Sequence, residues 1–379
     1  MEKPLTGAGG VAGKARRLYR GIAEANPFYR PSKYGYSNAR VSSMKSLLLK
    51  KELLQELARV RSIDAVVGML ERTPYKEELV KASIKHHGSE LVEVAAARHF
   101  ASVAQKLVRI APKEDRKAVD VLLTKWDVVN TKILLNARLT GKTYQDVAPF
   151  LMPLESLDEA EAKGLFEGKG TALFMRFVKT RLGKGLMESG MVSNTELEKL
   201  FMNFGNAEIM KLELLLDTFY YSLYQKSGMF LTREMAPIAK TFATEIDLKN
   251  ATTIIRLKRH GVGEKKSIGR FLIKGGSKPL RSFSGMMEAK DEKDTLKAAA
   301  QLFGLKTAPS DVVELEMTFE KILGAAKVRA FYRTTLSLGT LLGFLLLKEE
   351  EVKNIRKIAT AKEFGTPDKK IEEMLVFQN

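Results

Sequence analysis

The side chains best suited to acid–base or metal chemistry are four histidines, His86, His87, His99 and His260. Two histidines spaced as His-Glu-x-x-His would bind zinc from one face of a helix, but no pair here has that pattern and no acidic cluster accompanies them. The chain has no cysteine, so thiolate metal sites and disulfides are excluded. We expect the histidines to be packed or solvated, and we predict no catalytic residue and no metal site.

One short motif resembles the end of a phosphate-binding loop. Gly141-Lys142-Thr143 would need a glycine five positions before Gly141, where the sequence has Asn136, and a preceding strand, where the pattern is helical. Gly141 is better explained as a helix cap. Gly261-x-Gly263 likewise lacks the third glycine of a dinucleotide-binding loop. We therefore expect no nucleotide, no other cofactor and no small-molecule substrate.

The strongest local charge signal runs from Arg256 to Arg281, with nine Lys or Arg, five glycines and a single acid, Glu264. One interpretation is a solvated linker between a second and a third domain, because charge runs are usually solvated. The other is a surface that faces an anionic partner, either acidic protein loops or lipid headgroups. The candidate patch consists of Lys265, Lys266, Arg270, Lys274, Lys278 and Arg281.

The whole chain is also basic, with a formal net charge of +18 over 379 residues. Such an excess favours nucleic acid, anionic lipid or acidic protein as partner without choosing among them. Residues 1–33 are rich in glycine and contain seven Lys or Arg and two Glu, which predicts a flexible basic arm. No apolar region near the start indicates a signal peptide.

The most hydrophobic stretch, Thr334–Leu347, has 14 uncharged residues. A helix that spans a bilayer needs about 20, so this stretch predicts a buried helix of a soluble or peripheral protein. Elsewhere apolar residues recur at steps of three and four, which places them on one helical face. An example is the series Leu212, Leu215, Leu216, Phe219 and Leu223. Sustained alternation is scarce, and we predict an all-α fold.

An internal repeat organises these helices. Three segments share an acid, an Asn three residues later and a Gly eleven residues after the Asn. They are Asp127-Val-Val-Asn130 to Gly141, Asp247-Leu-Lys-Asn250 to Gly261, and Glu351-Val-Lys-Asn354 to Gly365. We interpret the acid as a first-turn residue and the Gly as the left-handed residue that ends the helix. Asn is a poor helix former, so we expect its side chain to bond to a neighbouring helix.

A second landmark precedes each Asn. Glu93 and Glu213 lie 37 residues before Asn130 and Asn250, and Glu316 lies 38 before Asn354. A large residue follows each Glu by seven positions: Phe100, Tyr220 or Leu323. A helix with Glu followed by a helix with Asn is thus one module used three times. The Asn-to-Asn distances of 120 and 104 residues give units of domain size.

Several motifs resemble one known family. Tyr34-Gly-Tyr-Ser-Asn-Ala-Arg-Val41 with Met44-Lys-Ser-Leu47 is similar to the opening signature of the C subunit of archaeal A-type and bacterial V/A-type ATPases, a relative of the d subunit of eukaryotic V-type ATPases. Glu213-Leu-Leu-Leu-Asp217 with Phe219-Tyr-Tyr221, and Asp247-Leu-Lys-Asn250 with Arg256-Leu-Lys258, resemble its next two helices. Leu342-Gly-Phe-Leu345, Lys348-Glu-Glu-Glu351 and Asn354-Ile-Arg356 resemble its C-terminal signature.

The resemblance implies three similar helical domains in a funnel with approximate threefold symmetry. We expect the arm at 1–33, then domains at 34–146, 147–263 and 264–379. It further implies a non-catalytic central-stalk component of a rotary ATP synthase, peripheral on the cytoplasmic face of the cell membrane. Its expected partners are the membrane proteolipid ring and the D and F subunits of the rotor. The arm has no counterpart that we recognise in the family, and the net charge of +18 is higher than we expect of it.

Two other functions remain as alternatives. The charge favours a basic helical nucleic-acid-binding protein, although no helix-turn-helix, zinc finger or set of stacking aromatics is recognisable, and the one tryptophan, Trp126, is better explained as core. A helical hydrolase is less favoured because no nucleophile and base form a recognisable pair.

Overall fold

A computed structural model describes residues 29–154, 157–226, 232–262 and 264–377. Every regular element in these ranges is a helix and none is a strand, which confirms the all-α prediction. The first of them, α2 (Tyr29–Lys45), includes the last residues of the predicted arm, 29–33, and the rest of that arm lies outside the described residues. Pro31 lies in the first turn of α2, where a missing backbone N–H costs nothing.

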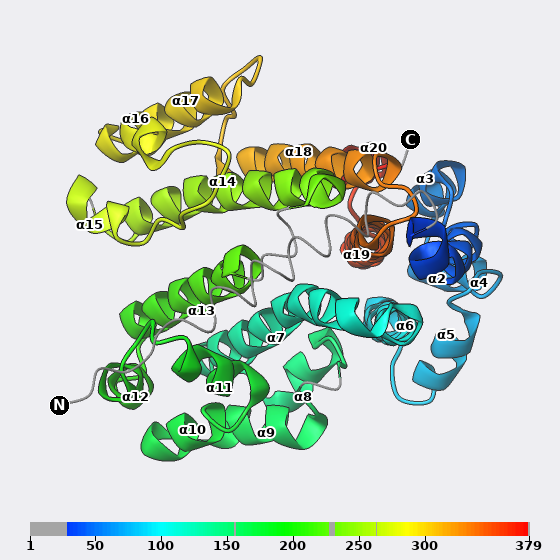
Figure 1. Ribbon diagram of the computed structural model, residues 1–379, viewed down its shortest axis with the longest axis horizontal. Coiled ribbons are helices and arrows are strands. Elements are labelled where there is room, and N and C mark those ends of the chain that lie inside the picture. The colour runs from blue at the N-terminus through cyan, green and yellow to red at the C-terminus, as the bar shows by residue number, and fades with distance from the viewer. Residues whose placement is uncertain (1–28, 155–156, 227–231, 263, 378–379) are drawn as a thin grey trace.

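Six long helices form the frame of the molecule (Figure 1). Helices that follow one another in the chain form three pairs, which we call hairpins. The hairpins are α6 (Gly88–Ile110) with α7 (Arg116–Leu139), α13 (Asn206–Lys226) with α14 (Ala236–Arg259), and α18 (Val312–Tyr332) with α19 (Leu338–Glu363). The helices that carry the predicted Glu come first in each hairpin, and those that carry the predicted Asn come second.

Shorter helices fill the connections between hairpins. Before α6 lie α3 (Lys51–Arg59), α4 (Ile63–Leu70) and α5 (Lys76–Ala82). Between α7 and α13 lie α8 (Tyr144–Val147), α9 (Glu159–Glu167), α10 (Gly170–Phe177), α11 (Arg181–Glu188) and α12 (Asn194–Met202). Between α14 and α18 lie α15 (Lys265–Gly269), α16 (Ser284–Glu288) and α17 (Glu292–Phe303), and α20 (Asp368–Met374) follows α19. The 3₁₀ turns are η1 (Lys113–Asp115), η2 (Ala148–Phe150), η4 (Arg233–Met235) and η5 (Leu280–Phe283).

The hairpins pack against one another in cyclic order. The first helix of the second hairpin, α13, packs on α7 of the first hairpin, and α18 packs on α14 of the second. The first helix of the first hairpin, α6, packs on α19 of the last (Figure 1). The chain is therefore closed by contact between its N-terminal and C-terminal parts, which α2 and α3 extend by packing on α19 and α20.

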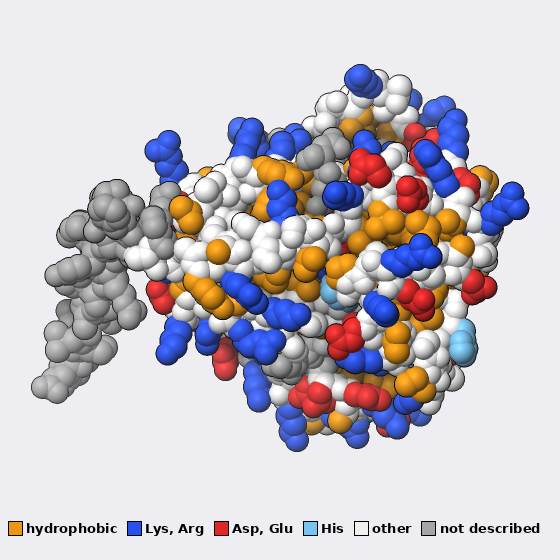
Figure 2. Space-filling view, turned by 90° about the vertical axis from the view of Figure 1, so that its right-hand side faces the viewer, with side chains coloured by type: hydrophobic (Ala, Val, Ile, Leu, Met, Phe, Trp, Pro, Cys, Tyr) orange, Lys and Arg blue, Asp and Glu red, His pale blue; other side chains and the backbone are white. Residues whose placement is uncertain are grey.

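Of the hydrophobic stretch predicted to be a buried helix, Leu338–Leu347 form the beginning of α19, whereas residues 334–337 lie in the turn before it. Leu341, Leu342 and Phe344 are buried, and α6 and α18 cover this part of the helix. None of the helices that the structure describes is long and apolar enough to span a bilayer. On the side formed by α2 to α5, charged side chains of both signs surround scattered hydrophobic ones (Figure 2).

The three repeat glycines end their helices as predicted. Gly141, Gly261 and Gly365 have φ values of 68°, 79° and 65°, in the left-handed region that favours glycine. After each, the next N–H donates to a carbonyl five residues back, as from Lys142 to Ala137 at 3.0 Å. This is the Schellman cap. Gly141-Lys142 thus ends a helix, and the element that precedes it is α7 rather than the strand of a phosphate-binding loop.

Candidate functional site

Each repeat asparagine binds the backbone of one downstream residue twice. The side-chain N–H donates to its carbonyl, and the side-chain oxygen accepts from its N–H. The pairs are Asn130 with Met152 (both 2.8 Å), Asn250 with Ile273 (2.9 and 2.7 Å) and Asn354 with Val376 (2.6 and 3.0 Å). All these residues are buried.

The predicted partner, a neighbouring helix, was wrong. Met152, Ile273 and Val376 lie in non-helical segments that return along the helix after its glycine cap. A helix uses its own N–H and C=O groups internally, whereas an extended residue presents both to one side chain. An Asn amide matches that pair of groups, which explains why the same residue type recurs at all three positions.

Each return segment also contacts the other helix of its hairpin. In the first hairpin, η2, which directly precedes this segment, packs on α6. In the second, Gln225 of α13 donates to the carbonyl of Lys274. In the third, a Cβ added at Gly324 of α18 would come within 2.2 Å of Val376. Each Asn therefore fixes a return segment that contacts both helices of its hairpin. We call this return segment the wedge.

The predicted upstream glutamates lie at the contacts between successive hairpins. Each reaches the residue six positions after a repeat Asn, on the helix packed against it. Glu93 accepts from Thr360 (3.4 Å), Glu213 accepts from Asn136, and Glu316 pairs with Arg256 (3.8 Å). Glu93 also forms an ion pair with Arg356 of α19. In all three copies, the residue six positions after the repeat Asn thus contacts the upstream Glu of an adjoining hairpin.

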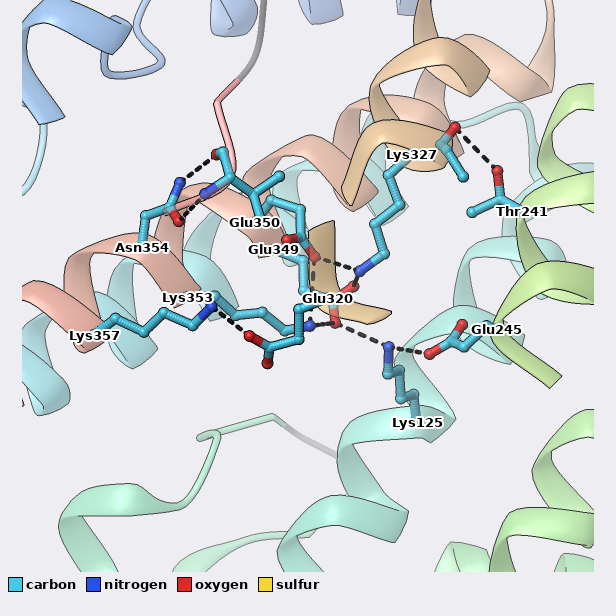
Figure 3. A network of polar contacts seen from close by, with 12 residues as sticks. Lys125, Thr241, Glu245, Glu320, Lys327, Glu349, Glu350, Lys353, Asn354 and Lys357 are labelled. Atoms are coloured by element: carbon cyan, nitrogen blue, oxygen red, sulfur yellow. Dashed lines mark hydrogen bonds and ion pairs between the residues drawn. The ribbon is translucent and has the colours of Figure 1, made fainter. Parts of the chain in front are cut away.

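The second helices of the three hairpins meet at a charged cluster (Figure 3). Lys125 of α7 binds Glu245 of α14 at 2.8 Å and Glu349 of α19 at 2.9 Å. These three residues occupy the same position of the repeat, five before Asn130, Asn250 and Asn354. Equivalent positions come together only around a shared centre, so the central cluster, Lys125, Glu245 and Glu349, lies in the middle of the three hairpins.

Two further lysines neutralise the central cluster. Lys327 of α18 is fully buried and binds Glu349 at 3.0 Å and Glu350 at 2.6 Å. Lys353 lies 3.5 Å from Glu349. Burial opposes ionisation of Glu349, but Lys125 and Lys327 beside it hold its pKa well below its usual range. The cluster therefore consists of charged groups that compensate one another.

The space beside the central cluster is packed. A cavity of about 10 Å³ remains there, which has room for about one water molecule. Leu122, Phe242 and Leu346 line it, again at one position of the repeat, eight before each Asn. Trp126 lies beside it as a core residue, as predicted, with its ring 5.3 Å from that of Phe100. The centre is therefore closely packed and leaves no room for a substrate.

Comparison with known proteins identifies this architecture. A family model described as ATP synthase (C/AC39) subunit matches residues 37–374. The chain belongs to the ATP synthase (C/AC39) subunit family. The chain is 27% identical over 355 residues to the A-type ATP synthase C subunit of Methanosarcina acetivorans, covering 91% of this chain and 93% of that protein.

Two other relatives agree with this family assignment. The A-type ATP synthase C subunit of Pyrococcus abyssi is 27% identical, with 90% of both chains covered. That of Desulfurococcus is 27% identical, with 93% of both chains covered. The resemblance noted in the sequence is thereby confirmed for this (C/AC39) family member over most of its length.

The repeat acids of this family member are not first-turn residues, and that interpretation was wrong. Asp127, Asp247 and Glu351 are buried in the middle of helices that begin at least eleven residues earlier. Asp247 accepts from the N–H groups of Ser277 (3.1 Å) and Lys278 (3.2 Å) on the return segment. Glu351 accepts from Tyr75 at 2.6 Å and pairs with Lys348. Asp247 and Glu351 thus bind adjoining segments, and none of the three acids lies where it could offset the helix dipole.

The predicted basic patch follows α14 in the chain and lies on α15, on η5 and on the segment that joins them. Lys265 pairs with Glu288, and the ammonium group of Lys278 lies 5.4 Å from the centre of the Phe303 ring. Lys266, Arg270, Lys274 and Arg281 are exposed. Ile268 and Phe283 within the same stretch are buried in the core. The stretch therefore has an apolar inner side as well as a basic outer side.

The histidines are packed or exposed in the described structure. His99 packs on Tyr75 at 4.4 Å between ring centres, and burial lowers its pKa to about 3. His86 lies 2.5 Å from the carboxylate of Glu90, and His87 and His260 are exposed. Among the described residues, no group of three His, Asp or Glu side chains could hold a metal ion.

We expect the stability of the protein to fall in acid as the central cluster loses its negative charge. The folded-state pKa of Glu349 lies below its ordinary value of 4.5. The stabilisation is therefore present above pH 4.5 and is lost as pH falls from there through the folded-state pKa. Thermal unfolding between pH 7 and pH 3 measures this effect. Glu349→Gln should flatten the acid limb of the profile, and an unchanged limb would show that other carboxylates control it.

Proposed function

We propose that this protein is a non-catalytic central-stalk component of a rotary A-type ATP synthase. It would connect the rotor shaft, with its D and F subunits, to the membrane proteolipid ring on the cytoplasmic face of the cell membrane. In this role it transmits torque between ion translocation and ATP synthesis or hydrolysis. The observation that carries the proposal is the cyclic set of hairpins around a buried charged centre.

Torque transmission requires stiffness rather than chemistry. Close-packed helices resist deformation, and polar groups that are buried and fully bonded specify one arrangement. The wedge held by each Asn supports a fixed opening of each hairpin. We propose that the hairpins with their connections form the three domains, 34–146, 147–263 and 264–379, of a funnel. The packed centre would close the funnel, so that a shaft seated in it stops at the central cluster.

Co-purification is the direct test of the proposed function. The tagged protein should retain a proteolipid ring and the D and F subunits from detergent-solubilised membranes. Recovery of the chain without either would contradict the proposal. The alternative, a nucleic-acid-binding protein, is favoured by the charge of +18. Filter binding at physiological salt separates the two, because tight and salt-sensitive binding without affinity for the rotor supports the alternative.

We expect charge reversal on the predicted basic patch to weaken assembly without unfolding the protein. Lys265, Lys266 and Lys274 are exposed, so replacing all three by Glu should leave the melting temperature nearly unchanged. Electrostatic contacts with ring or rotor should weaken, most visibly at low salt. The control reverses the charge of three exposed lysines on the part of the molecule formed by α10, α11 and α12, which we call the α10–α12 layer. They are Lys169, Lys184 and Lys199. Assembly that is unchanged at moderate salt would remove the patch from the interface.

A further inference from the structure

One end of the molecule is formed by the three hairpin turns together with α2. Near its start, α2 meets the first turn, where Tyr34 donates to Asp115 at 2.8 Å. One turn later, Asn38 lies 3.5 Å from the carbonyl of Ser337 in the third turn. The second turn joins them through η4, which packs on α19. We call this region the hairpin end: residues 32–45, 109–117, 232–240 and 329–337.

The hairpin end is strongly basic. Its residues include eleven Lys or Arg and three Asp or Glu. Two of the acids are already paired with Lys33. Its ammonium group lies 2.6 Å from Asp115, which is buried, and 3.3 Å from Glu114. Eight of the cations are exposed and form no ion pair with any described residue. They are Arg40, Arg109, Lys113, Lys117, Arg233, Lys240, Arg329 and Arg333.

Cations toward the opposite ends of the long helices are placed differently. Many of them have a carboxylate partner on an adjoining element. The pairs are Arg256 with Glu316, Arg259 with Glu292, Lys265 with Glu288, Lys357 with Glu320 and Lys362 with Asp368. Exposed cations that form no ion pair with any described residue also occur elsewhere, for example Lys266, Arg270 and Lys274, but the hairpin end combines eleven cations with only three acids, a net charge of +8 out of the +18 of the chain.

Exposed tyrosines accompany these cations. The side chains of Tyr36 and Tyr332 are 68% and 53% exposed, on α2 and at the end of α18. The ammonium group of Lys45 lies 4.5 Å from the centre of the Tyr332 ring. Tyrosine is enriched where proteins meet the membrane–water interface, and Lys and Arg near such a surface are attracted to anionic lipid. The combination therefore matches a headgroup layer.

We propose that the hairpin end binds anionic lipid headgroups directly. The cations come from α2 and three separate turns, so they are spread over an end of the molecule and do not follow one groove. A membrane presents its charge as a layer, whereas a nucleic-acid strand presents a line of phosphates. This deepens the proposed function by naming the end of the protein that faces the membrane, and it rests on that function for its biological setting.

Vesicle co-sedimentation of the isolated full-length protein tests the inference. We expect binding to phosphatidylcholine vesicles that contain phosphatidylglycerol, no binding to phosphatidylcholine alone, and weakening by salt. Replacing Arg40, Lys113 and Arg333 by Ala should reduce the affinity at least tenfold, since each cation near an anionic surface contributes about fivefold. Melting curves check that the variant is folded.

The control variant replaces Lys169, Lys184 and Lys199 by Ala, which removes the same charge from the α10–α12 layer. It should bind vesicles nearly as well as the unchanged protein. Equal losses in both variants would show that net charge alone acts and would overturn the inference. Binding to a DNA duplex but not to anionic vesicles would also overturn it. Co-purification with ring and rotor in the absence of vesicle binding would reject this inference and leave the proposed function standing.

Discussion

Replacing Lys125 by Glu is expected to destabilise the protein by about 3–5 kcal/mol, the cost of breaking a buried ion pair so that charges remain without compensation. The variant would place a third carboxylate against Glu245 and Glu349, which Lys125 now binds at 2.8 and 2.9 Å. The three hairpins meet at this point, so the loss should appear as lower global stability. Urea unfolding measured by circular dichroism gives the change in free energy.

A second variant separates charge from packing at the central cluster. Adding Glu245→Lys to Lys125→Glu restores one attractive pair with the signs exchanged, and should recover part of the lost stability. Lys117→Glu is the matched control, because Lys117 is an exposed lysine of the same helix, and it should change stability by less than about 0.5 kcal/mol. If Lys125→Glu were as mild as this control, the cluster would not hold the hairpins together.

The central cluster was missed in the sequence although its positions were available. The residues five before each repeat Asn are Lys, Glu and Glu, all charged. Comparison of repeat copies finds positions where the residue type is alike. Around a shared centre the copies must instead be complementary, since three like charges would repel one another. Because one copy has Lys where the other two have Glu, the position does not stand out as a repeat in the sequence. The same difference in charge allows the cluster to form.

The asparagine partners were missed for a different reason. Met152, Ile273 and Val376 bind through their backbone, so their side chains carry no polar signal. Only regular spacing could have indicated them, because they follow their Asn by 22, 23 and 22 residues and are all apolar. The Gly caps were predicted correctly because a left-handed backbone demands a residue type, whereas an extended segment accepts many.

The position of the repeat acids shows how far a local pattern can be trusted. The aligned segments begin near the acid, but α7, α14 and α19 begin earlier, at Arg116, Ala236 and Leu338. Their first halves differ in sequence, from the apolar start of α19 to the Pro-containing start of α14. The sequence repeat therefore covers only the second half of each helix, which binds a return segment. It does not indicate where the helix begins.

The cyclic packing explains how a repeated chain becomes one stiff body. Each first helix packs on the second helix of another hairpin, so every hairpin contacts both of the others. Closure joins α6 and α19, which are far apart in the sequence and whose packed contact includes the ion pair of Glu93 and Arg356. A load applied to one hairpin is shared with both neighbours. The proposed coupling between two rotating parts requires this property.

Asn250→Ala is expected to destabilise the protein by about 1–3 kcal/mol, because it leaves the N–H and the C=O of buried Ile273 without partners. The return segment that carries Lys274 should loosen first. Hydrogen exchange would detect this as faster exchange of the Ile273 amide, and thermal melting would give the global effect. A wedge that loosens in this way would also let the angle between α13 and α14 vary.

Asn136→Ala provides the control for Asn250→Ala, since it removes an exposed Asn that bonds to Glu213 on the surface. It should cost less than about 1 kcal/mol, as for most surface changes. Asn130→Ala and Asn354→Ala should resemble Asn250→Ala, because the same pair of hydrogen bonds recurs with Met152 and Val376. If the three buried sites differed widely, or if all matched the exposed control, the Asn–backbone pair would not be the element that holds each hairpin open.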